Sequence, residues 1–350
     1  MRNKVSWEYF EFVFNQSSSA FCQKLRSTYK GYYLTAIDGD QYTIERNLHT
    51  TNEGYKGQKC GKNKETYGLK MFLTIAVDMI SGSPLAITAS ENSDELTSGL
   101  QTTTKVLNRH NHEKEGIVVK KSLEKHIFTY DRLYFCGKLI ELHKQNQTNF
   151  IVRCKRNGTF SEVSNFVNSG KSEELVEING MKIRILKAIH EETAFYYATN
   201  ILDENISIEQ ISWIYLRRWE SETTNCHGVK TIGIEKFHTN KINGMKQEIF
   251  ASFWTLLISK SNKINMKQTK EDFDKKMYRR QNTKRVYNKI LDNLVTLFGD
   301  RKNYILNKIE SLAQKTTRII KRISRRYERM RKYQRQKKYP QQKALEILTP

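Results

Sequence analysis

The feature that most restricts the fold is a series of short apolar runs, several of which end in an aspartate. The runs are YLTAID (33–38), MFLTIAVD (71–78), LAITAS (85–90) and KHIFTYD (125–131). Apolar runs of this length predict strands, and the turn residues SGSP between the second and third runs predict a β-hairpin. Residues 94–108 and 136–145 have helical spacing. Strands and helices in this order predict a mixed α/β sheet with helices on its faces.

The organisation of the chain must be inferred from changes of pattern, because only three prolines punctuate its 350 residues. After about residue 158 the pattern becomes β-like, with MKIRILKAI and AFYYATN as the clearest strands. Residues 303–338 favour a helix and are dense in Lys and Arg. The expected regions are a residual N-terminal region (1–30), the first part of the core (31–157), a β-rich insertion (158–203), a helical part of the core carrying Glu222 (204–262) and a basic helical C-terminal region (263–350).

The stretch ISIEQISWIYLRRWESE predicts a helix with an aromatic, a cation and a carboxylate on one face. Ser207, followed by Gln210 three residues later, has the form of a capping box at its start. At about 100° per residue, Tyr215, Arg218 and Glu222 share a face of this helix. An equally acceptable interpretation makes Arg218 and Glu222 a surface ion pair worth only ~0.3–0.5 kcal/mol.

Asp38 and Asp131 end two of the predicted strands, where polar groups of an α/β sheet converge on one edge. Together with Glu222 they would supply three carboxylates, and carboxylates are the ligands that two Mg²⁺ ions prefer, with Mn²⁺ able to substitute. Arg218 and Tyr215 suit the binding of neighbouring phosphates. The set predicts metal-assisted phosphoryl transfer. The alternative for either aspartate alone is a residue that caps a turn.

The charge balance indicates an anionic polymer as the partner. The chain has 60 Lys and Arg against 37 Asp and Glu, a net charge of +23, and residues 301–350 hold 16 Lys and Arg against three Glu. This favours nucleic acid over a membrane surface, with backbone binding by residues 319–338, although a charge run can also be a solvated face. The five scattered cysteines form no C-x-x-C pair, and no run of 18 apolar residues occurs. We therefore expect a cytoplasmic protein without a zinc site, a disulfide framework or membrane association.

At these residues the chain resembles the DDE-type transposases of bacterial insertion sequences, in the group with a Y-x2-R-x3-E-x6-K signature. The resemblance covers residues 18–260 and includes AIDGD around Asp38, the YDRLYF run after Asp131, the helix leading to Glu222, and IGIEKFHT (232–239). Its order and spacing are specific, with 93 residues from Asp38 to Asp131 and 91 from Asp131 to Glu222.

The resemblance implies an RNase H-like core that is interrupted by the β-rich insertion. It implies Asp38, Asp131 and Glu222 as catalytic metal ligands, and Tyr215, Arg218 and Lys230 as contacts to DNA phosphates. Such enzymes cut the 3′ ends of an element with water and then use the freed hydroxyl to attack target DNA. The implied partners are double-stranded DNA, as inverted repeats and target, and a second copy of the chain, at the nucleoid.

The sequence departs from the family pattern in three places. The signature lysine falls at Lys230 instead of position 229, Asp40 follows Gly39 after the first aspartate, and only 37 residues precede Asp38. The last departure leaves open a truncated, inactive DNA-binding remnant, and a related metal-dependent nuclease is a further alternative.

An aromatic residue of the insertion can stack on a base flipped out of the element end in this family. The candidates are Phe195, Tyr196 and Tyr197, for which a role in the strand core is the competing interpretation.

Overall fold

The part of the chain that can be described covers most of its first 261 residues. The computed structural model describes residues 4–60, 64–91, 94–109, 111–114, 117–120, 123–156, 158–190, 193–203, 205–218, 224, 237–261, 277–280, 283–293, 304, 307–308, 311 and 318–321. Glu222, Lys230 and residues 322–350 lie outside these ranges. None of the described helices is long and apolar enough to cross a membrane.

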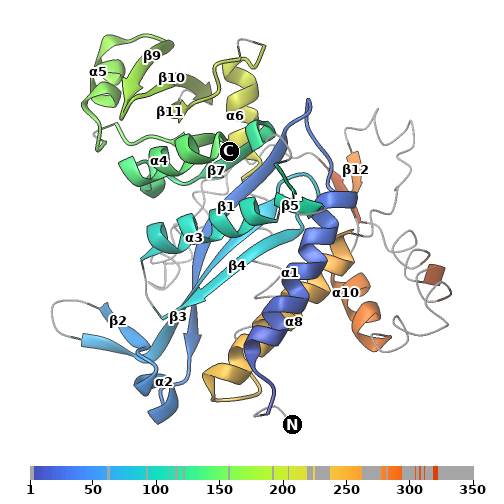
Figure 1. The fold of residues 1–350 in the computed structure, drawn as a ribbon. Coiled ribbons are helices and arrows are strands. Elements are labelled where there is room, and N and C mark those ends of the chain that lie inside the picture. Colours follow the sequence, from blue (N-terminus) through green and yellow to red (C-terminus); the bar gives the residue numbers. More distant parts are fainter. Residues whose placement is uncertain are drawn as a thin grey trace, which may run out of the picture.

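A mixed sheet forms the centre of the described structure (Figure 1). Its nine strands run in the order β2-β3-β1-β7-β8-β11-β10-β9, with β4 also paired to β3. Their bounds are β1 (Tyr33–Ile44), β2 (Lys56–Cys60), β3 (Lys64–Asp78), β4 (Pro84–Ser90), β7 (His126–Tyr130), β8 (Asn149–Arg153), β9 (Glu173–Ile178), β10 (Met181–His190) and β11 (Thr193–Thr199). β1, β7 and β8 are parallel neighbours, whereas β1 is antiparallel to β3 and β3 to β4. This confirms the predicted mixed sheet and the predicted hairpin.

The central strands β1, β7 and β8 are buried on both faces of the sheet, which explains why their sequences are apolar runs. Phe128 of β7 and Phe150 of β8 belong to the larger core, whereas Ile127 and Ile151 belong to the smaller core on the opposite face. The alternation follows from the two-residue period of a strand. Two hydrophobic layers therefore hold β1, β7 and β8 between them.

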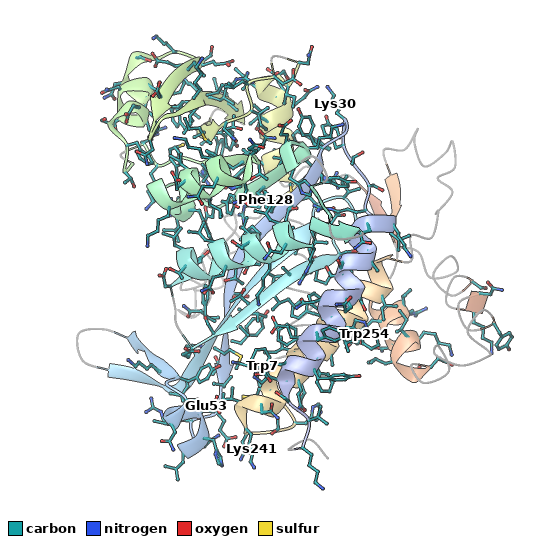
Figure 2. The ribbon with its side chains drawn as sticks, in the orientation of Figure 1. Trp7, Lys30, Glu53, Phe128, Lys241 and Trp254 are labelled. Carbon is teal, nitrogen blue, oxygen red and sulfur yellow. The ribbon has the colours of Figure 1, made fainter. Side chains whose placement is uncertain are left out.

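Helices cover both faces of the sheet (Figures 1 and 2). The described helices are α1 (Trp7–Lys24), α2 (Leu48–Asn52), α3 (Glu95–Asn108), α4 (Gly137–Asn146), α5 (Ser161–Ser169), α6 (Ile208–Leu216), α8 (Ile242–Ser261) and α10 (Thr283–Asp292), with short 3₁₀ turns η1 (Leu123–Lys125) and η2 (Arg132–Tyr134). α1 and α8 lie side by side and, with α3, contribute to the larger core. α6 contributes Ile211, Ile214 and Tyr215 to the smaller core.

The expected insertion is continuous with the central sheet. β9, β10 and β11 pair as an antiparallel set, and β11 continues onto β8 through pairs such as Ala198 with Val152. The capping box expected at the start of α6 is present, since Ser207 Oγ accepts the Gln210 N–H and the Gln210 side chain accepts the Ser207 N–H.

The helix expected across residues 303–338 is confirmed at the described residues Tyr304, Asn307, Lys308 and Ser311, which are helical, and is wrong at residues 318–321. Residues Arg318–Lys321 form β13, which pairs with β12 (Met277–Arg280). Two adjacent β-branched residues, Ile319 and Ile320, favour the strand at this point. A further small hairpin joins β5 (Asn111–Lys114) to β6 (Ile117–Lys120).

A buried ion pair fixes the start of β1. Arg26 Nε lies 3.0 Å from Asp78 Oδ1, and both side chains are fully buried. The Arg26 guanidinium also donates to the Leu34 carbonyl and to Thr35 Oγ1. Because a buried charge needs both a partner and full hydrogen bonding, this group ties the loop after α1 to β1 and to the end of β3.

Candidate active site

Asp38 and Asp131 occupy matching positions on two neighbouring parallel strands. The β1–β7 register pairs Ala36 with Thr129, and each aspartate follows two residues later on its own strand or just beyond it. Residues two apart on a strand point to the same face, and neighbouring strands lie about 4.8 Å apart. The structure thus brings the two predicted aspartates together at one edge of the sheet.

The environments of the two carboxylates differ. Asp38 was expected to end its strand, but β1 continues to Ile44, so Asp38 lies within the strand, and 16% of its side chain is exposed. Asp131 follows β7 and caps η2, because its carboxylate accepts the Arg132 N–H. The turn-capping role considered for a strand-ending aspartate is therefore real for Asp131. The carboxylate is only partly buried and remains close to the other acidic groups described below.

Arg218 and Tyr215 meet at the same edge. Arg218 Nη1 lies 3.3 Å from Asp38 Oδ1, and the Arg218 guanidinium carbon lies 5.8 Å from the centre of the Tyr215 ring. α6 ends at Leu216, and the Arg218 N–H bonds to the Tyr215 carbonyl at 2.9 Å, a tightening that is common at helix ends. The two side chains share one face, although the expected helix does not continue unbroken past Leu216.

Burial keeps the Tyr215 hydroxyl protonated. Desolvation raises the pKa of Tyr215 to about 12, with the nearby Arg218 lowering it and Asp131 raising it further. The ring packs against Tyr197 at 4.9 Å between centroids. At neutral pH this phenol is a positioned hydrogen-bond donor beside the two aspartates.

Glu222 and Lys230, the remaining predicted site residues, lie outside the described residues. Within the described ranges no three His, Cys, Asp or Glu side chains gather closely enough to hold a metal ion. The donor chemistry still fits a hard divalent cation, since two carboxylates each follow paired positions of neighbouring parallel strands by two residues and a third acidic residue is expected from the chain after α6. A complete set of three carboxylate ligands therefore depends on Glu222.

Glu95 is an acidic group at this site that the sequence analysis did not select. It is the first residue of α3, and a Cβ built on Gly39 would come within 3.2 Å of Glu95 Cγ. Desolvation raises the pKa of Glu95, and the charge of Asp131 raises it further, while Arg218 lowers it. The sequence signal that could have identified Glu95 is the start of a helix at Asp94 and Glu95, a few residues after strand β4.

A buried polar network supports the strand end that precedes Asp131. The Tyr130 hydroxyl lies 3.0 Å from His143 Nε2 and 3.0 Å from Thr103 Oγ1, while His143 Nδ1 lies 2.6 Å from Thr148 Oγ1. Burial lowers the pKa of His143 to about 3. A neutral imidazole is therefore locked between α3, β7 and α4, which fixes the end of β7.

The aromatic residues of β11 belong mainly to the core. Tyr197 is 1% exposed and Tyr196 8% exposed, and each belongs to one of the two hydrophobic cores. Phe195 is partly buried, with the Arg153 guanidinium 4.8 Å from its ring centre. The structure supports the strand-core interpretation for Tyr196 and Tyr197.

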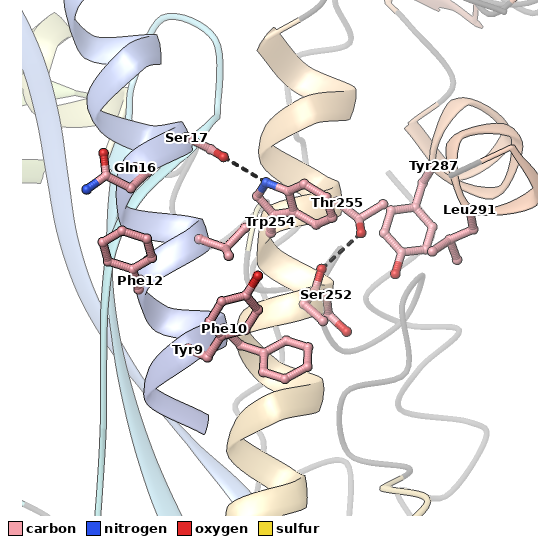
Figure 3. Close-up of a pocket in the computed structure, with 12 residues that line it drawn as sticks. Tyr9, Phe10, Phe12, Gln16, Ser17, Ser252, Trp254, Thr255, Tyr287 and Leu291 are labelled. Carbon is pink, nitrogen blue, oxygen red and sulfur yellow. Dashed lines mark hydrogen bonds between the residues drawn. The ribbon is translucent and has the colours of Figure 1, made fainter. Parts of the chain in front are cut away.

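A separate hollow of about 600 Å³ lies between α1, α8 and α10 (Figure 3). Its lining includes Tyr9, Leu291 and Trp254, whose Nε1 donates to Ser17 Oγ at 2.8 Å. The described residues that line it carry no carboxylate or basic group. It is chemically unlike the edge that holds Asp38.

The strand order and the paired aspartates define an RNase H-like α/β protein. Three antiparallel strands, β4, β3 and β1, are followed by the parallel strands β7 and β8, with Asp38 within β1 and Asp131 directly after β7. The sequence pattern described as Transposase DDE domain matches residues 29–258, which is most of the chain. The protein belongs to this transposase family.

The similarity to a solved structure is weaker than the match to the family. The chain is similar to one in a cryo-EM structure of a piggyBac transposase synaptic complex with hairpin DNA, at 12% identity and a TM-score of 0.41. The similarity covers 80% of this chain and 57% of the other, so the chain spans little more than half the length of that relative. No curated protein matches the sequence.

Proposed function

We propose that the chain is the transposase of a bacterial insertion sequence, which cuts the ends of the element and joins the freed 3′-hydroxyls to target DNA. The observation that carries this proposal is that Asp38, which lies against Arg218, and Asp131 each follow by two residues the paired positions Ala36 and Thr129 of two parallel strands. Family membership over residues 29–258 supports the same chemistry.

Asp38, Asp131 and Glu222 would hold Mg²⁺ ions, or Mn²⁺ in their place. When bound, two such ions supply charge neutralisation and activation of a water or hydroxyl for in-line displacement at phosphorus. The chain's part is to keep two carboxylates fixed on rigid strands. The buried network around His143 and Tyr130 does this for the end of β7.

Arg218, Tyr215 and Lys230 would hold the phosphates that flank the reacting bond. Arg218 already lies against Asp38, and guanidinium groups form two-pronged bonds to phosphate oxygens. Tyr215 donates one hydrogen bond, because its pKa of about 12 keeps the phenol protonated. These groups orient the DNA backbone without reading base sequence.

The proposed partners follow from the chemistry and the charge. Double-stranded DNA, as the inverted repeats and the target, is the substrate, and a homodimer on paired ends acts at the nucleoid. The net charge of +23 supports a polyanionic partner.

The test is DNA cleavage by the purified full chain on a duplex that carries the inverted repeats of its element. Wild type should nick and join in Mg²⁺ or Mn²⁺, and Asp131→Asn should abolish both activities while DNA retention stays near normal. The exposed Asp203→Asn is the matched control and should behave as wild type. Retention without nicking in either metal would identify a DNA-binding remnant, and nicking without joined product would identify a nuclease.

A further inference from the structure

Arg153 is the last residue of β8 and lies on the same face of the sheet as Asp38. Ala36 of β1 and Ile151 of β8 both belong to the smaller core, and residues two apart on a strand share a face. Asp38 and Arg153 each come two residues later on their strands, so both side chains lie on the face that α6 covers. The strand order places β7 between them, with Asp131 directly after it. Arg153 therefore lies on the β8 side of the two aspartates.

Aromatic rings of β11 and α6 lie next to the Arg153 guanidinium. Its central carbon lies 4.8 Å from the centre of the Phe195 ring, and Arg153 is paired directly with Tyr197 in the β8–β11 register. Desolvation raises the pKa of Tyr197 and of Tyr215, whereas the charge of Arg153 acts to lower both, so the guanidinium lies near the two hydroxyls. A guanidinium that rests on the face of a ring keeps its planar edge available for hydrogen bonds.

In the part of the chain that the structure describes, Arg153 forms no ion pair. Arg218 lies against Asp38, and Arg184 Nε lies 2.7 Å from Glu173 Oε1, so these two guanidinium groups have carboxylate partners. The Arg153 side chain is partly exposed. A guanidinium that is held in place without a carboxylate suits a phosphate, because it can form two parallel bonds to phosphate oxygens.

We propose that Arg153, held by the ring of Phe195, binds a backbone phosphate of the DNA on the β8 side of Asp131. The inference rests on the proposed function for the identity of the partner, and it adds a phosphate contact to that of Arg218. Two strand spacings of about 4.8 Å separate β8 from β1, so this phosphate lies about 10 Å from one held beside β1. A DNA strand rises about 3.4 Å per nucleotide, so the two contacts fall about three nucleotides apart.

The experiment measures the affinity of the full chain for a DNA duplex, by fluorescence anisotropy, over a range of salt concentrations. The test variant is Arg153→Gln, which removes the charge and keeps a polar side chain. Loss of one phosphate contact should weaken binding about tenfold and make the plot of log affinity against log salt shallower by about 0.9. Arg153→Lys keeps the charge and should therefore keep the wild-type slope, even if Arg153→Gln lowers the melting temperature of the protein.

Arg156→Gln is the matched control. Arg156 is exposed, and its guanidinium carbon lies 5.9 Å from the centre of the Tyr196 ring, which belongs to the larger core on the opposite face of the sheet. The control removes the same charge from the same stretch of chain, so affinity and slope should stay at the wild-type values. Equal losses in Arg153→Gln and Arg156→Gln would overturn the inference, because they would show only a general effect of charge.

Phe195→Leu tests the support that the ring gives to Arg153. It should weaken duplex binding about threefold when Arg153 is present and should have no effect in the Arg153→Gln background. The same loss in both backgrounds would contradict this role of Phe195.

The binding measurement separates this inference from the proposed function. A loss of affinity and slope in Arg153→Gln, but not in Arg156→Gln, supports the inference even if no cleavage is ever seen. Equal affinities and slopes for wild type and Arg153→Gln overturn it even if the enzyme cuts DNA.

Discussion

Asp38 and Asp131 each follow by two residues the Ala36–Thr129 pair of β1 and β7, although 93 residues separate them in sequence. The parallel pairing of β1 with β7 produces this correspondence, because the two strands run in the same direction from the paired residues Ala36 and Thr129. The chain between them forms the antiparallel strands β3 and β4 and the helix α3. The proposed chemistry depends on this register.

Arg218 competes with a cation for Asp38 in our account. Arg218→Ala removes the guanidinium that lies 3.3 Å from Asp38 Oδ1. Mn²⁺ binding in the absence of DNA should therefore tighten by up to about fivefold, which corresponds to the free energy of a partly exposed ion pair. DNA cleavage should fall about 100-fold, because a phosphate contact is lost. Calorimetry and a nicking assay measure the two effects.

Arg217→Ala is the matched control. Arg217 lies over Trp213 at 5.1 Å and donates to the Met79 carbonyl, so its loss should leave Mn²⁺ affinity unchanged. Weaker Mn²⁺ binding in Arg218→Ala would show that Arg218 organises the carboxylates instead of competing for them.

Gly39 is needed because β1 passes close to two side chains. A Cβ at this position would lie 2.6 Å from Phe72 Cζ and 3.2 Å from Glu95 Cγ. Gly39→Ala should therefore cost about 1–3 kcal/mol of unfolding free energy by overpacking, measured by urea denaturation. Adding Phe72→Leu should recover part of this loss, since it removes the closer contact. A fully additive double variant would disprove the contact.

The buried His143 makes stability depend on pH. Burial lowers its pKa to about 3 in the folded chain from the ordinary value of 6.5, so the unfolded chain binds the additional proton between these values. Stability from this group is present above pH 6.5 and is lost as pH falls towards 3, by about 1.4 kcal/mol per pH unit.

His143→Gln should flatten this dependence in denaturation curves recorded from pH 7 to pH 4. The exposed His238→Gln serves as control and should keep the wild-type slope. An unchanged slope in His143→Gln would mean that the imidazole is not held neutral inside the fold.

The elements that sequence predicted well have strong local signals. The apolar runs that end at Asp38 and Asp131 became β1 and β7, and the Ser207–Gln210 capping box began α6 as expected. Each depends on residues within a few positions of one another. The meeting of Tyr215 with Arg218 was also predictable, because they lie one turn apart.

The features that sequence did not predict depend on long-range pairing. The insertion joins the main sheet through β11 and β8, a contact that no local pattern encodes. Glu95 reaches the site only because α3 packs against β1 at Gly39. β13 depends on pairing with β12, about 40 residues earlier, where local composition had favoured a helix.

Mn²⁺ affinity measured for wild type, Asp38→Asn, Asp131→Asn and the double variant tests the central claim most directly. If the two aspartates hold the same ions, each single change should weaken binding at least tenfold, and the double variant should lose much less than the sum of the two. Equal Mn²⁺ binding by wild type and the double variant would contradict a metal site shared by Asp38 of β1 and Asp131 after β7.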